Sequence, residues 1–351
     1  MYGLDEFTLR EVVARSGEIY AEKPVSAMTG KPAVTYERFA RSAVRLAGRL
    51  AGEYGIGKGD RVAILGENRP EWGVAYFAVT AMGAVAVPIL TEFSSEQIGN
   101  IIKHAGCRGI IVSRRFREKA TGIEGIGGTD IADSPGGVND TTGTADTPAG
   151  FFHLDMENGP LPAPDDNPAP GGIPANDGPA GKYGDSCPGG DWSGFPAVGE
   201  EDLAAIIYTS GTTGSSKGVM LTHRNIVSNA YATRSILRMH PGDRLVSILP
   251  LAHTYECTLG LVAVVLQGAF VSYLDKPPTA TVLLPAVKLV RPTIMISVPL
   301  IMEKIFRSSF LPVLQKKSVY RFGWGRRILN FIAGIKLKRL FGGRLDRKSV
   351  V

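Results

Sequence analysis

Hydrophobic and polar positions along the first 120 residues follow the spacing of helices and strands that succeed one another. Apolar residues at helical spacing predict helices over residues 7–21, 35–54, 71–82 and 94–104. Short apolar runs between these helices predict strands over residues 61–65, 84–90 and 109–112. Thr35 stands at the N-cap position of the second helix. Because strands joined by helices of this length usually run parallel, we predict an α/β fold with a parallel, doubly wound sheet.

The same alternation returns over residues 201–302. Apolar runs predict strands over residues 203–208, 219–221, 244–249, 269–274 and 293–297. Helical spacing predicts helices over residues 225–237, 258–267 and 281–289. We therefore expect residues 1–120 and 201–302 to be two ordered parts of one domain, with parallel-rich sheets and flanking helices.

The segment between these two parts has a different composition. Residues 121–200 hold 18 of the 43 glycines and 11 of the 23 prolines, and turn-forming pairs such as Asn158–Gly159 recur. Such a segment buries too little apolar surface to offset the entropy of ordering it. We predict a largely disordered Gly/Pro/Asp-rich insertion, with a short ordered piece near residues 151–156. Its aspartates lack the spacing of a calcium-binding loop.

The net charge of +6 is unevenly distributed along the chain. Residues 121–200 carry 13 acidic side chains and one basic one, whereas residues 303–351 carry 13 lysines and arginines against two acids. We expect this basic tail to be helical. Its charges either form a solvated helix face or contact an anionic lipid surface or a phosphate-rich ligand. No nucleic-acid-binding motif accompanies them, so nucleic acid is not an expected partner.

Cysteine use and hydropathy indicate the cellular compartment. The three cysteines, Cys107, Cys187 and Cys257, match neither a disulfide framework nor a metal site. The first residues are amphipathic and carry acids, unlike a signal peptide. The longest apolar helix candidate, residues 258–271, is too short to cross a bilayer. We expect a cytoplasmic protein, with peripheral contact at the inner membrane face through residues 303–351.

The stretch LAAIIYTSGTTGSSKGVMLTH, residues 203–223, has the composition of a phosphate-binding loop. Glycines let the backbone approach an anion, the hydroxyls donate hydrogen bonds, and Lys217 adds a positive charge. It is not a P-loop, because Ser216 precedes the lysine and Gly218 follows it. The apolar run after Gly218 predicts a returning strand, so the loop joins two strands. An ordinary Gly/Ser/Thr-rich surface turn is the alternative.

YTSGTTGSSKGVMLTH closely resembles the phosphate-loop signature of the adenylate-forming (AMP-binding) superfamily. Residues 35–90 are similar to the N-terminal region of that superfamily. LPLAHTYECTLGL and RPTIMISVPLIMEKI most resemble its long-chain acyl-CoA synthetase branch. The resemblance covers about residues 1–118 and 200–345, and implies the N-terminal portion of the adenylate-forming enzyme fold. An aryl-CoA ligase or an adenylation domain of the same superfamily is the nearest alternative.

The resemblance implies a two-step ligase reaction that uses ATP, Mg²⁺ and CoA. A carboxylate, here a long-chain fatty acid, attacks ATP to give an acyl-adenylate, and the CoA thiol then forms a thioester. The β- and γ-phosphates would be held by Lys217 together with Ser210, Gly211, Thr212, Thr213 and Gly214. Thr209 would help to place Mg²⁺, and Lys217 and His253 would be the catalytic residues. The alternative for His253 is a structural role, as a polar residue at a strand end whose hydrogen bonds are made within the protein. Tyr208 is expected to pack beneath the loop, and Tyr255 and Glu256 either shape the acyl entrance or are structural.

Several motifs that follow the phosphate loop in this superfamily do not occur in the sequence. These are the adenine-binding Gly-rich turn, the Tyr-Gly-x-Thr-Glu motif with its Mg²⁺-binding glutamate, the ribose-binding aspartate and the catalytic lysine of a mobile C-terminal domain. We therefore expect a truncated chain that binds ATP weakly and lacks synthetase activity by itself. A non-catalytic phosphate-binding or membrane-binding fragment is the alternative from another functional class.

Overall fold

A computed structural model describes residues 3–121, 151–157, 191–209 and 217–299, together with Glu303 and Arg307. The helices of these residues are α1 (Leu9–Ile19), α2 (Tyr36–Tyr54), α3 (Pro70–Ala81), α4 (Ser95–Ala105), α5 (Arg117–Thr121), α6 (His223–Ile236), α7 (Thr254–Glu256), α8 (Ala263–Gln267) and α9 (Ala280–Val290), with a 3-10 turn η1 (Arg114–Phe116) and a π-helical turn η2 (Cys257–Val262). The strands are β1 (Pro24–Met28), β2 (Val34–Thr35), β3 (Arg61–Leu65), β4 (Val85–Ile89), β5 (Cys107–Val112), β6 (Phe152–Asp155), β7 (Leu203–Thr209), β8 (Lys217–Thr222), β9 (Arg244–Val246) and β10 (Phe270–Tyr273).

These strands form two sheets. The larger sheet has the order β6-β5-β3-β4-β7-β8 and is parallel except for the β7–β8 hairpin. The smaller sheet has the order β2-β1-β10-β9, and only β2 runs antiparallel to its neighbour. The predicted parallel arrangement is confirmed for β3, β4 and β5. The predicted parallel-rich sheets are thus two, and the smaller one is built around β1, a strand that the hydrophobic pattern did not predict: β10 pairs with β1, and β9 pairs with β10.

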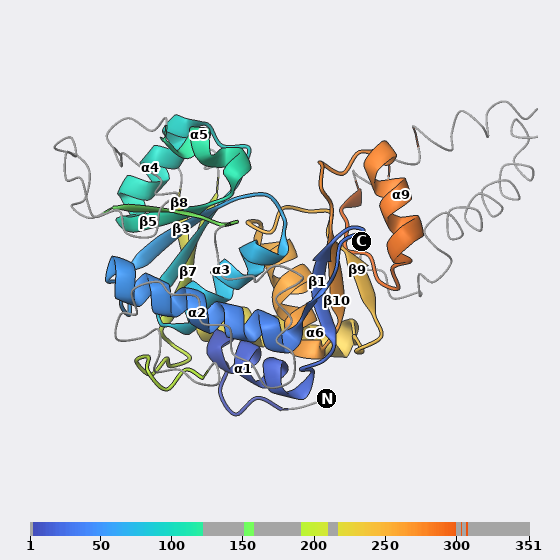
Figure 1. Cartoon of the computed structure of the whole chain (residues 1–351), viewed down its shortest axis with the longest axis horizontal. Coiled ribbons are helices and arrows are strands. Elements are labelled where there is room, and N and C mark those ends of the chain that lie inside the picture. Colours follow the sequence, from blue (N-terminus) through green and yellow to red (C-terminus); the bar gives the residue numbers. More distant parts are fainter. Residues whose placement is uncertain are drawn as a thin grey trace, which may run out of the picture.

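Helices separate and cover the two sheets (Figure 1). The main core lies between the sheets, where α1, α2, α3 and α8 pack, and it includes the fully buried Tyr36 and Trp72. A second cluster joins the other face of the larger sheet to α4, and a third joins β9 to α9. The Thr35 side chain accepts a hydrogen bond from the Arg38 amide, which confirms the predicted N-cap of α2.

Two predicted elements near the end of the described chain differ in the structure. The strand expected over residues 293–297 is reduced to one isolated parallel bridge between Leu245 and Ile294. The apolar helix expected over residues 258–267 begins as the π-helical turn η2 and becomes regular only in α8.

Part of the predicted insertion is ordered. The piece expected near residues 151–156 forms β6, which pairs with β5. Residues 191–200 are also ordered, contrary to expectation, because Trp192 and Phe195 are buried in the main core. Arg10 lies over the Trp192 ring and donates to the Pro196 carbonyl at 2.6 Å. The rest of the insertion and nearly all of the basic tail at residues 303–351 lie outside the described residues.

Of the helices that the structure describes, none is both long and apolar enough to cross a membrane. The described residues likewise contain no group of three or more His, Cys, Asp or Glu side chains arranged to hold a metal ion.

Substitution of Gly109 is expected to weaken the pairing of β5 with β6. A Cβ at Gly109 would lie 2.2 Å from the ring of Phe152, its partner in the register. That ring stacks on Tyr54 with centroids 4.3 Å apart and has little room to move. We expect Gly109→Ala to lower the free energy of unfolding by about 2 kcal/mol, measured by urea denaturation. The control is Gly52→Ala in α2, where a Cβ meets nothing within 4 Å. Equal midpoints for the two variants would contradict this packing.

Candidate functional site

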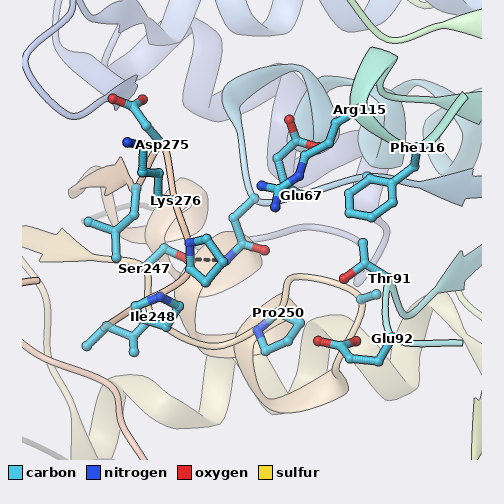
Figure 2. Close-up of a pocket in the computed structure, with 16 residues that line it drawn as sticks. Glu67, Thr91, Glu92, Arg115, Phe116, Ser247, Ile248, Pro250, Asp275 and Lys276 are labelled. Carbon is cyan, nitrogen blue, oxygen red and sulfur yellow. Dashed lines mark hydrogen bonds between the residues drawn. The ribbon is translucent and has the colours of Figure 1, made fainter. Parts of the chain in front are cut away.

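A cleft of about 160 Å³ lies where the loops after five parallel strands meet. The loops that follow β3, β4 and β5 come from the larger sheet, and those that follow β9 and β10 come from the smaller one. Figure 2 shows Arg115 and Phe116 on one side of the gap, and Asp275 and Lys276 on the opposite side. In open α/β sheets, ligands usually bind at the carboxyl ends of parallel strands. The cleft is therefore the candidate site.

The charged side chains that line the cleft are of both signs. Glu67, Glu92 and Asp275 supply the negative charges, and Arg115 and Lys276 supply the positive ones. Arg115 stacks its guanidinium over the Phe116 ring at 5.6 Å. Among the described residues, no ion pair involves Arg115 or Lys276. These two cations are consequently available to an anionic ligand.

Glu67, by contrast, is held in a network around Arg69. Its carboxylate accepts from the Ser113 hydroxyl at 2.5 Å and lies 3.4 Å from the Arg69 guanidinium. Arg69 also pairs with Glu71 at 2.9 Å and with Glu157 at 2.5 Å. Burial alone would lower the pKa of Arg69, but the Glu71 hydrogen bond and the surrounding carboxylates raise it above its ordinary value. This network holds Glu67 in place at the cleft wall and connects it, through Arg69, to Glu157, which follows β6.

Thr209 and Lys217 face each other at the loop end of the β7–β8 hairpin. They are register partners, and both are exposed. β7 runs parallel to β4, with Ala205 opposite Ala86, so Thr209 lies at the same sheet edge as the cleft-lining loop after β4. The predicted returning strand is confirmed as β8. Ser210, Gly211, Thr212, Thr213 and Gly214, the rest of the predicted phosphate site, lie outside the described residues.

Tyr208 supports the base of this hairpin. Its ring is buried on the α4 side of the larger sheet, and its hydroxyl lies 2.6 Å from Nδ1 of His104. Burial raises the pKa of Tyr208. A Cβ added at Gly218 would lie 3.2 Å from the tyrosine ring. The residue after Lys217 is therefore a glycine that allows β8 to pass close to Tyr208.

His253 lies on a different segment, between β9 and η2. It is exposed, and it caps α7 by accepting a hydrogen bond from the Tyr255 amide at Nδ1, at 3.3 Å. A neutral ring that accepts at Nδ1 carries its proton on Nε2. His253 can therefore donate from Nε2 to an anion. No described contact joins it to Thr209 or Lys217.

Behind His253, the segment is anchored by buried polar groups. Glu256 is fully buried and accepts from the Ser247 hydroxyl at 2.6 Å. Burial raises the pKa of Glu256 to about 8. Because its carboxyl group is enclosed, Glu256 does not line an entrance, and its neighbour Tyr255 is half-buried against the main core. Asn68, which lines the cleft, donates to Ser247 at 2.8 Å.

Comparison with known proteins decides the family. The sequence profile of the AMP-binding enzyme family matches residues 13–344. The chain belongs to this family. It is 28% identical over 262 residues to a long-chain-fatty-acid–CoA ligase, FadD15, of Mycobacterium bovis, a match that covers 73% of this chain and 37% of the relative. The chain thus spans well under half the length of this relative.

Solved structures of the same fold agree with this assignment. The N-terminal domain of FACL13 from Mycobacterium tuberculosis superposes with a TM-score of 0.64 at 22% identity, covering 86% of this chain and 65% of that one. ATP-bound MatB from Rhodopseudomonas palustris superposes with a TM-score of 0.62 at 23% identity, covering 86% and 52%. The predicted N-terminal adenylate-forming fold is therefore confirmed.

The motif-based prediction did not find the residues that line this AMP-binding enzyme's cleft. It named Lys217, Thr209 and His253, none of which is a lining residue, and it gave no role to Asn68 or Arg115. The available signal was position, because Asn68 follows β3 closely and Arg115 follows β5. Polar residues directly after parallel strands are candidates for ligand contact even when no motif contains them.

Proposed function

We propose that this chain carries the phosphate-gripping half of an acid–thiol ligase that activates a long-chain fatty acid. ATP and the carboxylate give an acyl-adenylate and pyrophosphate, and CoA then displaces AMP to form a thioester and release a proton. The observation that carries the proposal is a hydroxyl-rich sequence with glycines and a lysine, on a hairpin that ends at the same sheet edge as the cleft-lining loop after β4. The family of the chain and its fatty-acid-ligase relative support it.

In this proposal Lys217 acts on the first step by electrostatics. The attacking carboxylate and the phosphates of ATP are both anionic, so a fixed positive charge at the leaving pyrophosphate lowers the barrier. Lys217 begins β8 and is the register partner of Thr209, so its backbone position is fixed while its side chain is exposed to a phosphate ligand. The loop from Ser210 to Gly214 supplies amide and hydroxyl donors to the same phosphates.

His253 is assigned to the carboxylate end of the reaction. Its Nδ1 already accepts from the Tyr255 amide, so only Nε2–H is available to substrate. A neutral donor at this place can orient a carboxylate or phosphoryl oxygen without neutralising the nucleophile. The Leu249–Leu251 backbone before it forms a wall of the cleft through Pro250.

Thr209 is the proposed protein ligand for Mg²⁺. Mg²⁺ commonly takes one or two protein oxygens and completes its shell with substrate phosphates and water. Thr209 is exposed at the end of β7 and offers one hydroxyl oxygen, so its donor chemistry fits an ion that arrives with ATP. Bound there, Mg²⁺ would neutralise phosphate charge. Arg115 and Lys276, across the cleft, suit the phosphates of ATP or CoA.

The test joins this chain to the carboxyl-terminal part of the FadD15 relative and measures pyrophosphate release with ATP, Mg²⁺ and CoA. Oleate is expected to support release, whereas benzoate and amino acids are not. The chain alone is expected to release none, since the adenine-binding and Tyr-Gly-x-Thr-Glu motifs do not occur in its sequence. Release with benzoate but not oleate would overturn the acid class. A folded joined protein that is inactive with every acid would overturn the ligase assignment.

A further inference from the structure

One side chain from the larger sheet clamps the backbone of the segment that leads to His253. Asn68 Nδ2 donates to the Leu249 carbonyl at 2.6 Å, and Asn68 Oδ1 accepts from the Leu251 amide at 2.8 Å. The clamp therefore spans Pro250, which has no amide hydrogen of its own. Two bonds from one planar amide fix both the position and the tilt of this backbone.

The orientation of the Asn68 amide is itself fixed. Its second Nδ2 hydrogen goes to the Ser247 hydroxyl at 2.8 Å, and that hydroxyl donates onward to Glu256 at 2.6 Å. Ser247 and Glu256 are both buried. A flipped amide would place Nδ2 against the Leu251 N–H and lose all three bonds. Only one orientation of Asn68 satisfies its neighbours.

The far end of the segment is anchored by the same chain of bonds. Glu256 ends α7, three residues after His253, and its carboxyl is seated against η2. A Cβ added at Gly260 would lie 2.6 Å from Glu256 Oε1, so a glycine is needed there for this approach. Oε2 of Glu256 has no partner among the described residues, so burying this carboxyl group costs free energy. His253 thus lies between two backbone points that one network fixes.

We propose that Asn68 is the positioning residue for His253, acting through its clamp on Leu249–Leu251 and held in place by Ser247 and Glu256. The proposal rests on the proposed function in one respect, the assignment of His253 to the carboxylate. Asn68 itself contributes no chemistry. It sets where the Nε2–H of His253 points and how far the Pro250 wall stands from the cleft.

Three variants of the full chain separate this role from general support of the fold. Asn68→Ala removes all three bonds, whereas Asn68→Asp keeps the acceptor for the Leu251 amide and loses the two donors. Ser272→Ala is the control, because Ser272 is buried in the smaller sheet and its hydroxyl bonds only to Thr29 among the described residues.

Hydrogen exchange of single amides, followed by NMR, measures directly how strongly the hydrogen bond to Asn68 protects the Leu251 amide. The Leu251 amide is expected to exchange about 10-fold faster in Asn68→Ala, the effect of losing one hydrogen bond, and about as slowly as in wild type in Asn68→Asp. The Ile64 amide in β3 should be unchanged in every variant. Unchanged Leu251 exchange in Asn68→Ala would overturn the clamp. Equal acceleration at Leu251 and Ile64 would show a general structural role and overturn positioning.

Ligand binding provides the second readout. Calorimetry uses the same variants in the chain joined to the carboxyl-terminal part of the FadD15 relative. An oleoyl-sulfamoyl adenosine, a stable mimic of the acyl-adenylate, is expected to bind about 10-fold more weakly to Asn68→Ala, with partial recovery in Asn68→Asp. Inorganic pyrophosphate should bind wild type and variants alike, because its contacts lie at the loop after Thr209. Equal binding of the mimic to wild type and Asn68→Ala would overturn the inference. A wild type that binds neither probe would instead contradict the proposed function, and the exchange data alone would then decide the clamp.

Discussion

Lys217→Ala is expected to slow acyl-adenylate formation by about 100-fold in the chain joined to the carboxyl-terminal part of its FadD15 relative. The lysine is the only cationic side chain in the stretch from Leu203 to Thr222. Its removal leaves amides and hydroxyls to hold a leaving pyrophosphate that carries several negative charges. ATP–pyrophosphate exchange with oleate measures the step, and because the charge counts most on the leaving group, the rate should fall more than ATP affinity.

Two variants make that result specific. Lys217→Arg keeps the charge with a different donor geometry and should recover part of the rate. Lys103→Ala removes the same charge from an exposed position on α4 and should leave the rate within about twofold, because surface charges are screened. If Lys217→Ala also stayed within about twofold of wild type, Lys217 would not be the phosphate-binding lysine.

The sequence predicted those helices and strands that are determined by residues close together in the chain. α2 was predicted from its N-cap Thr35 and its apolar face, and β3 was predicted with the bounds that the structure has. β1 and β2 were not predicted, because their stability comes from pairing rather than from their own sequence. β1 pairs with β10, more than 240 residues away along the chain, and β2 has only two residues.

The candidate site likewise contains residues that a local motif indicates and residues that only the fold brings together. Lys217 and Thr209 could be proposed from the sequence because their motif is contiguous, and their role stays a prediction. The cleft could not, because its lining comes from loops after five strands in two sheets that no single stretch of sequence brings together. Asn68 is the clearest case, since its bonds cross from β3 to the segment after β9. Its role follows from topology and not from composition.

The free energy of unfolding is expected to fall as pH rises toward 8, because Glu256 folds as a neutral acid. Burial raises the pKa of Glu256 from 4.5 to about 8 in the folded chain. Between these values the folded protein keeps a proton that the unfolded chain has lost, so stability is full below pH 4.5 and is lost as pH rises to about 8. The slope is at most about 1.4 kcal/mol per pH unit, or roughly 4–5 kcal/mol over the whole range.

His223 changes the free energy of unfolding with pH in the opposite direction to Glu256. It therefore limits the pH range over which the effect of Glu256 can be measured separately. Burial lowers the pKa of His223 from 6.5 to about 4, so its protonation destabilises the fold as pH falls below 6.5. From pH 6.5 to 8 the folded histidine is neutral and only the unfolded chain still loses protons, which raises stability by about 0.4 kcal/mol, so a decrease of about 2 kcal/mol is attributable to Glu256. Urea denaturation of wild type and Glu256→Gln at both pH values measures it. The amide cannot ionise, so Glu256→Gln should show only the small rise from His223 over this range. A wild type that matches Glu256→Gln would mean that Glu256 is already ionised when folded, and that Ser247 holds a carboxylate rather than an acid.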